Sequence, residues 1–247
     1  MGESAIFRSV VSRPDEKKTK AHKLEFVSLF LNAGAHIQHH YMFNSGVYDG
    51  KLQNPSWLID TEYDPVLDVY TQYDRIVRQF LNSFPNVRLM IGTGLNQDPY
   101  EKDLYYWRLK DHASFLKKIG VDFLDVESRM SKDFLIGFES EKRAKEAQNI
   151  LENSVAGDVK CLFEVDNRGI SLLVMLVYPS EISNSLNISV SGKTFAKFHE
   201  DVVFVAIKNG EHNGTGYLLD TGVSHQQGKE IQLAQLPSIV AKAFGLQ

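Results

Sequence analysis

Apolar runs and a helical repeat alternate over the first half of the chain. Residues 24–32 form a nearly continuous apolar run, as in strands that helices bury on both faces. A helical repeat follows over residues 65–84, with Asp64 as N-cap and Pro65 at the first helical position. Residues 87–91 are again apolar and end in a glycine-rich loop. Strand, helix and strand in this order predict a right-handed crossover in a parallel sheet.

Alternating helix and strand patterns are also predicted for residues 100–126 and near the C-terminus. Residues 100–119 are expected to form a helix that Gly120 ends, and residues 121–126 a third strand. Near the C-terminus, residues 202–207 read as a buried strand and residues 233–244 as a helix. We therefore predict an α/β fold with a doubly wound, mostly parallel sheet flanked by helices.

The middle of the chain has a different pattern of predicted elements. A strand at 134–138 and a charged helix at 140–152 precede two strands at 161–165 and 170–178. The last two flank Asp166-Asn167-Arg168-Gly169, a strong hairpin turn. The expected division is a flexible leader at 1–22, a core made of 23–130 and 201–247, and an inserted β-α-β-β cap subdomain at 131–200.

Composition narrows the class of protein. The 247 residues are 43% hydrophobic and 23% charged, ordinary values for a globular protein. The net charge of -4 argues against a nucleic-acid partner. The single cysteine, Cys161, excludes an internal disulfide and fits a reducing compartment. No apolar run approaches the roughly 20 residues that span a bilayer, so we expect a cytoplasmic protein without a membrane partner.

Histidines supply the candidate chemistry. His36, His39 and His40 follow the first predicted strand, and His212 lies in a glycine-rich loop after the strand at 202–207. Ligands of open α/β sheets bind at such strand ends, and imidazoles suit zinc. The alternative is that these histidines cap the sheet and bond to backbone carbonyls. Both interpretations stay open for His36 and His212, whereas the structural one is preferred for His39 and His40, since adjacent residues point in different directions.

The loop at residues 92–97 is a second candidate. Its sequence, Gly-Thr-Gly-Leu-Asn-Gln, could bind an anion through backbone N–H groups, although an ordinary turn is the preferred explanation. Together with the histidine loops it gives an expected ligand-binding set of His40, Thr93, Asn96 and Gly214.

The stretch from Phe26 to His36 resembles the alkaline phosphatase superfamily, especially its type I phosphodiesterase and nucleotide pyrophosphatase branch. In that family a strand ends in aspartate, with histidine four residues later. The helix from Pro65, the strand at 88–92, the loop at 209–216 and the closing segment 228–237 are similar to later elements of that family. The resemblance implies a divalent metal ion, zinc in the first instance, held by Asn32, His36 and His212.

The sequence departs from the family at three places. Asn32 stands where the family has aspartate, and Gly94-Leu95 stands where it has an Asp-His pair. The strand that carries the family's Ser or Thr nucleophile would precede residue 24, where no such strand is recognisable. A two-metal mechanism needs ligands for both ions. The chain is therefore expected to be the C-terminal part of a longer enzyme or a degenerate member.

Two functions follow as expectations. The first is a metal-dependent phosphoester or sulfate-ester hydrolase-like domain, which is incomplete because the nucleophile segment is absent. Whether such a domain is an enzyme is therefore left undecided by the sequence. The alternative is a non-catalytic module that binds a phosphate-bearing small molecule, or that serves in assembly with a missing N-terminal half or a second copy of itself.

Overall fold

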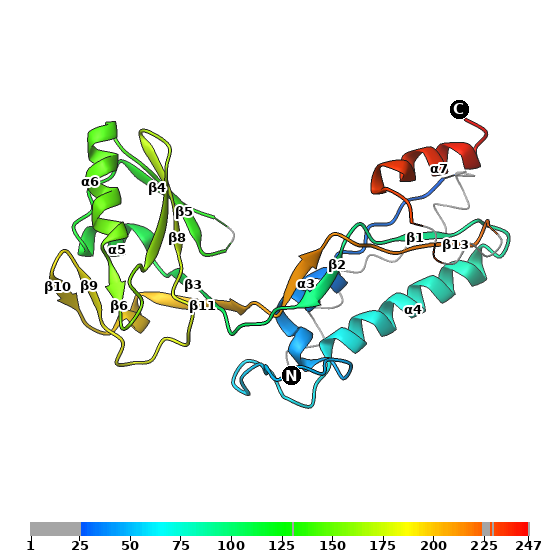
Figure 1. Cartoon of the computed structure of the whole chain (residues 1–247), viewed down its shortest axis with the longest axis horizontal. Coiled ribbons are helices and arrows are strands. Elements are labelled where there is room, and N and C mark those ends of the chain that lie inside the picture. Colours follow the sequence, from blue (N-terminus) through cyan, green and yellow to red (C-terminus); the bar gives the residue numbers. More distant parts are fainter. Residues whose placement is uncertain (1–25, 130, 224–227, 229, 247) are drawn as a thin grey trace. The chain divides into compact units, whose positions relative to one another are not determined.

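The computed structural model describes residues 26–129, 131–223, 228 and 230–246, so the predicted leader at 1–22 lies outside the described residues. The chain forms two compact units (Figure 1). Unit 2 is the continuous segment Glu101–Lys208. Unit 1 combines the described residues up to Tyr100 with those from Asn209 onward. The chain therefore passes between the units twice, and each unit is described by itself.

Unit 2 is built on antiparallel sheets. Four strands pair in the order β4-β5-β8-β7, three in the order β10-β9-β6, and β3 pairs with β11. The elements are β3 (Tyr105–Leu109), α5 (His112–Lys118), β4 (Asp125–Ser128), β5 (Asp133–Gly137), α6 (Glu141–Glu152), β6 (Val155–Ala156), β7 (Phe163–Asn167), β8 (Ser171–Leu176), β9 (Ile188–Val190), β10 (Lys193–Phe195), η2 (Phe198–Glu200) and β11 (Val202–Ile207).

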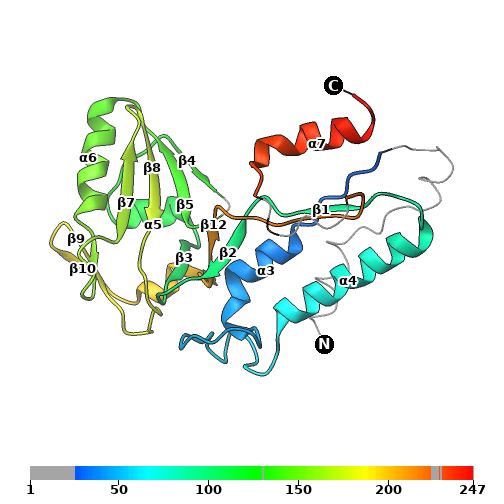
Figure 2. The ribbon, with the colours of Figure 1, turned by 45° about the vertical axis from the view of Figure 1, so that its right-hand side comes forward.

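Local sequence signals explain the centre of unit 2. The Ser140 hydroxyl accepts a hydrogen bond from the Arg143 N–H and caps α6, which buries Ala144, Ala147 and Leu151 on one face. This helix lies along β7 and β8 (Figure 2). Gly169 adopts φ +83° in the turn between these two strands, a conformation that glycine reaches without steric cost. The predicted strand, helix and hairpin at residues 134–178 are thus confirmed as elements.

The hydrophobic core of the described residues lies in unit 2. Its centre consists of phenylalanines from four elements: Phe115 of α5, Phe134 of β5, Phe163 of β7 and Phe198 of η2, all at most 2% exposed. Their ring centroids lie 5.9–6.4 Å apart, a normal spacing for interlocking aromatic rings. Alternate residues of β5 and β8 point into this core, as expected for strands buried on one face.

Unit 1 is held together differently. Its elements are α3 (Ala33–Tyr41), η1 (Met42–Asn44), α4 (Pro65–Ser83), β1 (Met90–Gly92), β2 (Asn96–Pro99), β12 (Gly210–Asn213), β13 (Leu218–Asp220), η3 (Leu233–Gln235) and α7 (Leu236–Ala243). Few of its apolar side chains are buried, among them Phe43 and Val69, while Phe30 is 85% exposed. The predicted helix at 65–84 is confirmed as α4, and the carboxylate of Asp64 accepts from the Leu67 N–H as its N-cap.

The strands of residues 90–109 pair with the strands of residues 202–220, and their order along the chain is reversed. β1 pairs with β13, β2 with β12 and β3 with β11, always antiparallel. Residues 90–109 therefore run against residues 202–220. The first two ladders belong to unit 1 and the third to unit 2.

The predicted doubly wound, mostly parallel sheet is wrong. The described residues form a mixed α/β structure of several small antiparallel sheets, so the parallel core that the family resemblance implies is absent from them. The predicted strand at 24–32 shows the reason. Its described residues, 26–32, form no strand, and Phe26 and Phe30 are 58% and 85% exposed. A continuous apolar run becomes a central strand only where helices cover both faces.

The predicted helix at 100–119 is also wrong in its first half. Residues 105–109, Tyr-Tyr-Trp-Arg-Leu, form β3, and α5 begins only at His112. Asp111 sets that boundary, because its carboxylate accepts from the Ser114 N–H as an N-cap. Aromatic residues favour strands, and here they pair with β11.

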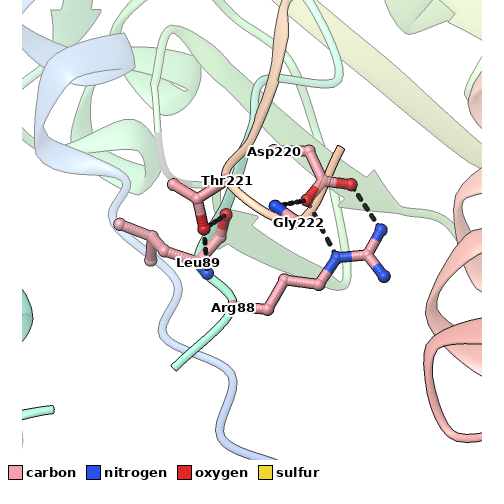
Figure 3. Close-up of polar contacts among 5 residues, drawn as sticks. All are labelled: Arg88, Leu89, Asp220, Thr221 and Gly222. Carbon is pink, nitrogen blue, oxygen red and sulfur yellow. Dashed lines mark hydrogen bonds and ion pairs between the residues drawn. The ribbon is translucent and has the colours of Figure 1, made fainter. Parts of the chain in front are cut away.

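An ion pair ties the β1–β13 ladder together at its end. The Arg88 guanidinium contacts both carboxylate oxygens of Asp220 at 2.9 and 2.6 Å (Figure 3). The Thr221 hydroxyl accepts from the Leu89 N–H beside them. The hydrogen bond from Arg88 lowers the pKa of Asp220, against a smaller opposing effect of desolvation, and the Gly222 N–H adds to the lowering.

This ion pair predicts a pH dependence of the β1–β13 ladder. Because the pKa of Asp220 is lower in the folded state than the unfolded value of about 3.9, its contribution is complete above the unfolded pKa. The contribution is lost as pH falls through the folded pKa. We expect Asp220→Asn to increase hydrogen exchange in residues 88–92 at neutral pH and to make that exchange less sensitive to acid. Asp74→Asn, which removes an exposed ion pair on α4, is the control and should change neither.

Candidate functional site: a histidine cluster on α3 and β12

Four histidines of unit 1 lie in one cluster. Three come from α3, which lies beside β2 and β12 (Figures 1 and 2), and His212 comes from β12. Ring centroids lie 4.9 Å apart for His36 and His40, 6.3 Å for His39 and His40, and 4.7 Å for His39 and His212. The cluster therefore brings together residues more than 170 positions apart in sequence.

His39 and His212 form the pair that spans two elements. The Nδ1 of His39 lies 3.2 Å from the Gly210 carbonyl oxygen, in the strand that carries His212. When Nδ1 donates this hydrogen bond, Nε2 is the nitrogen that carries the lone pair. Metal-ligating histidines typically have their second nitrogen fixed in this way by a carbonyl or carboxylate. The Gly210 carbonyl thus orients the His39 ring.

His36 and His40 form the second pair, one turn apart on α3. Asn32, the third predicted metal ligand, occupies the N-cap position of α3, but its side chain makes no capping hydrogen bond. Its carbonyl oxygen accepts from the His36 N–H at 3.2 Å. Of the predicted set, His36 and His212 are thus in the same cluster, but each has a different direct ring partner.

A buried amide pair fixes α3 against β12. The side chains of Asn54 and Asn209 exchange two hydrogen bonds of 2.8 and 3.0 Å and are 3% and 0% exposed. Asn209 also accepts from the Phe43 N–H, and its own N–H donates to the His39 carbonyl. These bonds connect the end of α3 and the segment after it to the start of β12. The network therefore sets the distance between His39 and His212.

Gln97 on β2 connects this strand to α3. It is directly opposite His212 in the β2–β12 ladder and is 8% exposed. Its Nε2 donates to the Ala35 carbonyl of α3, whereas the buried Oε1 has no hydrogen-bond partner among the described residues. A Cβ atom at Gly210 would lie only 2.6 Å from that oxygen and 2.8 Å from the backbone carbonyl oxygen of Gln38 on α3. A side chain at position 210 would thus push α3 away from the strand.

The donor set sets limits on a metal site. Within the described residues no group of three or more His, Cys, Asp or Glu side chains is placed to hold a metal ion. The His39–His212 pair offers two imidazoles, which suit zinc, copper or nickel. Two ligands are fewer than the three or four of typical zinc sites. An ion here would need ligands from a bound molecule or from water.

The glycine-rich loops have a structural role in this fold. The Thr93 N–H donates to the Tyr217 carbonyl, and the Thr93 hydroxyl accepts from the Tyr217 N–H, both at 2.9 Å. Asn96 is opposite Asn213 in the β2–β12 ladder, and Gly214 lies exposed just beyond it. A Cβ at Gly216 would overlap the Thr93 carbonyl, so this glycine allows two backbone segments to approach each other.

Outside the cluster, Asp111-His112 is explained by packing in unit 2. Asp111 caps α5, and the His112 ring lies 4.8 Å from Phe134 at the edge of the core. Desolvation, with a contribution from the Arg108 charge, lowers the pKa of His112, so burial favours the neutral ring. This position needs no ligand to account for it.

No helix in the described part of the chain has the length and apolar character that crossing a membrane requires. Comparison with protein-family models, with curated proteins and with solved structures gives no match. The fold and the site therefore define the protein only by its structure. It is a mixed α/β protein of two units with antiparallel sheets, and a cluster of histidines from one helix and one strand lies in unit 1.

Sequence reasoning misses two parts of this site. The bond from His39 to the Gly210 carbonyl is the kind of contact that the structural interpretation of this histidine predicts, but the sequence did not indicate that its ring lies beside that of His212. The pairing of Asn54 with Asn209 is not recognisable in the sequence. The one signal for Asn209 is its position before a glycine at the end of an apolar run, which does not specify a buried amide pair.

Proposed function

We propose that unit 1 is a zinc-dependent binding module for phosphate-bearing small molecules, with His39 and His212 as the protein ligands of the metal ion. The observation that carries this proposal is the 4.7 Å approach of these two rings from different elements, with His39 held by the Gly210 carbonyl. A zinc ion with two protein ligands keeps open positions, and phosphate oxygens are suitable ligands for them.

We propose binding and not hydrolysis because the cluster offers only two imidazole ligands for a metal ion. Zinc would supply Lewis-acid attraction for a phosphate oxygen. The residues of this chain hold the ion and, through the Asn54–Asn209 pair, keep α3 and β12 at a fixed separation. Phosphoryl transfer by two metal ions would need a second ligand set in addition. The choice of phosphate as the ligand class rests on the sequence resemblance of residues 26–36 and 209–216 to the alkaline phosphatase superfamily and not on the fold, which differs from the one that this resemblance implies.

Zinc titration of variants tests the proposal. We expect His39→Ala and His212→Ala each to abolish zinc binding, measured by calorimetry and by plasma emission after dialysis, because one remaining imidazole is a weak ligand. His199→Ala in unit 2 is the matched control and should bind zinc like the wild type. Far-UV circular dichroism checks that each variant is folded.

The His36→Ala variant distinguishes two ligand sets. Retained zinc supports the His39–His212 pair, whereas loss in His36→Ala together with retention in His39→Ala would favour Asn32, His36 and His212. In the zinc-loaded protein, inorganic phosphate should raise the melting temperature by an amount that follows RT ln(1 + [L]/Kd). The same rise in metal-free protein would show that phosphate binds without zinc and would refute the metal-dependent form of the proposal.

The exposed apolar side chains of unit 1 favour a second candidate, an assembly surface. Phe30, Tyr217 and Leu246 are 63–85% exposed, and exposed apolar side chains mark an interaction site where they form a contiguous patch. Sedimentation velocity of the same samples would reveal self-association as a concentration-dependent increase in sedimentation coefficient.

A further inference from the structure

The chain contains two Asn-Gly dipeptides that flank His212 on either side, Asn209-Gly210 and Asn213-Gly214. We infer that Asn213 is a site of spontaneous conversion to aspartate and isoaspartate, and that Asn209 is protected from the same reaction by burial. Both dipeptides carry the same chemistry four positions apart, so their surroundings alone decide which one reacts.

The reaction requires nothing beyond the chain and water. The backbone nitrogen of Gly214 attacks Cγ of Asn213, the N–Cγ bond forms, and the Cγ–Nδ2 bond breaks. Ammonia leaves, taking up the proton of the Gly214 N–H, and a five-membered succinimide remains. Water then opens the ring at one of its two carbonyls. One opening gives aspartate, and the other gives isoaspartate, in which the main chain runs through the former side chain.

The surroundings of Asn213 permit this attack. Gly214 is exposed in the bend that follows β12, and apart from its two chain neighbours no described residue would lie within 4 Å of a Cβ at that position. Only glycine leaves the attacking nitrogen unhindered by a side chain. The Thr215 N–H donates to Oδ1 of Asn213 at 3.0 Å, and such a donor stabilises the negative charge that develops on this oxygen during attack.

The surroundings of Asn209 prevent it. Asn209 is fully buried, with Oδ1 accepting from the Phe43 N–H and from Nδ2 of Asn54. Its Nδ2 donates to Oδ1 of Asn54. Gly210 is crowded by the Gln97 side chain and the Gln38 carbonyl. Rotation of the Asn209 amide toward the Gly210 nitrogen would break all three hydrogen bonds and leave buried polar groups unpaired.

Conversion of Asn213 would loosen the strand that carries His212. Its Nδ2 donates to Oδ2 of Asp98 at 2.7 Å, on the facing strand β2. In the aspartate product this donor is replaced by a second carboxylate, and like charges at that distance repel. In the isoaspartate product the main chain gains one methylene, which disturbs the register at the Asn213–Asn96 pair. The modification thus acts on the ladder beside the histidine cluster.

Peptide mapping after ageing tests the inference. The full-length protein is incubated in mildly alkaline buffer, and a parallel sample is incubated in denaturant. Cleavage after Glu200, Glu211 and Glu230 separates residues 201–211 from residues 212–230, so each dipeptide is in its own peptide. Mass spectrometry and enzymatic isoaspartate detection should find conversion only in the 212–230 peptide of the folded protein, and in both peptides of the denatured sample.

The Gly214→Ala variant provides the chemical control, since the open space at this position accommodates a methyl group. It should lose the conversion at Asn213 while leaving the 201–211 peptide unchanged. Equal conversion of both peptides in the folded protein, or an intact 212–230 peptide there, would overturn the inference. So would conversion in Gly214→Ala as fast as in the wild type.

Discussion

Phe163→Ala is expected to destabilise unit 2 by about 3–5 kcal/mol, the usual cost of truncating a buried phenylalanine. Phe163 is 0% exposed and lies between Phe115 and Phe134, so its removal leaves a cavity lined by rings from neighbouring elements. The surrounding sheet and helices relax only partly into such a cavity. Since stabilities of whole domains are only about 5–15 kcal/mol, this loss would leave unit 2 marginally folded.

The measurement uses the single tryptophan of unit 2. Trp107 packs 5.6 Å from Phe204, and its indole N–H donates to the Ser180 carbonyl, so its fluorescence reports on this unit. Trp57 of unit 1 is half-exposed and is replaced by phenylalanine in all samples. Urea titrations then compare Phe163→Ala with Ile170→Ala, a control in the exposed turn of the same sheet that should change stability by less than about 0.5 kcal/mol. A similar small change for both variants would show that the phenylalanine cluster is not the core.

Asn209→Leu is expected to destabilise unit 1 by about 2–4 kcal/mol, because leucine has a similar volume but no hydrogen-bonding groups. The substitution leaves the Phe43 N–H and Oδ1 of Asn54 without the Asn209 partner in a buried site, whereas Nδ2 of Asn54 keeps its bond to Oδ1 of Asn44. Each orphaned group costs about 1–3 kcal/mol. Unit 1 buries few apolar side chains, so polar contacts of this kind account for an unusual share of its stability.

Hydrogen exchange of peptides from residues 33–54 and 90–99 measures this loss locally. The double variant Asn54→Leu/Asn209→Leu completes a thermodynamic cycle. It should be more stable than the sum of the two single changes predicts, because removing both partners leaves fewer unpaired groups. Strict additivity would contradict the pairing of the two amides. Zinc binding should weaken in Asn209→Leu as well, since the same network positions His39 relative to His212.

The sequence determined the elements that carry their own local signals. The helix from Pro65 has an aspartate N-cap, a proline at its first position and an amphipathic repeat, and all three act within a few residues. The hairpin at Asp166–Gly169 depends on a glycine with positive φ, and Ser140 begins α6 through a single hydrogen bond. Such signals survive in any tertiary setting because their energy comes from neighbours in the chain.

Only the tertiary structure decided the direction of the sheets and the composition of the histidine cluster. An apolar run shows that burial of the segment is favourable. Whether the segment pairs at all, and whether it pairs parallel or antiparallel, depends on which strand lies beside it. Among the described residues, 26–32 have no such partner strand, and residues 105–109 find theirs in β11. The contact between the His39 and His212 rings could not be predicted from spacing, because the Asn54–Asn209 pair brings β12 to the end of α3. Contacts between distant segments fix these features, since their free energy depends on positions that local sequence does not encode.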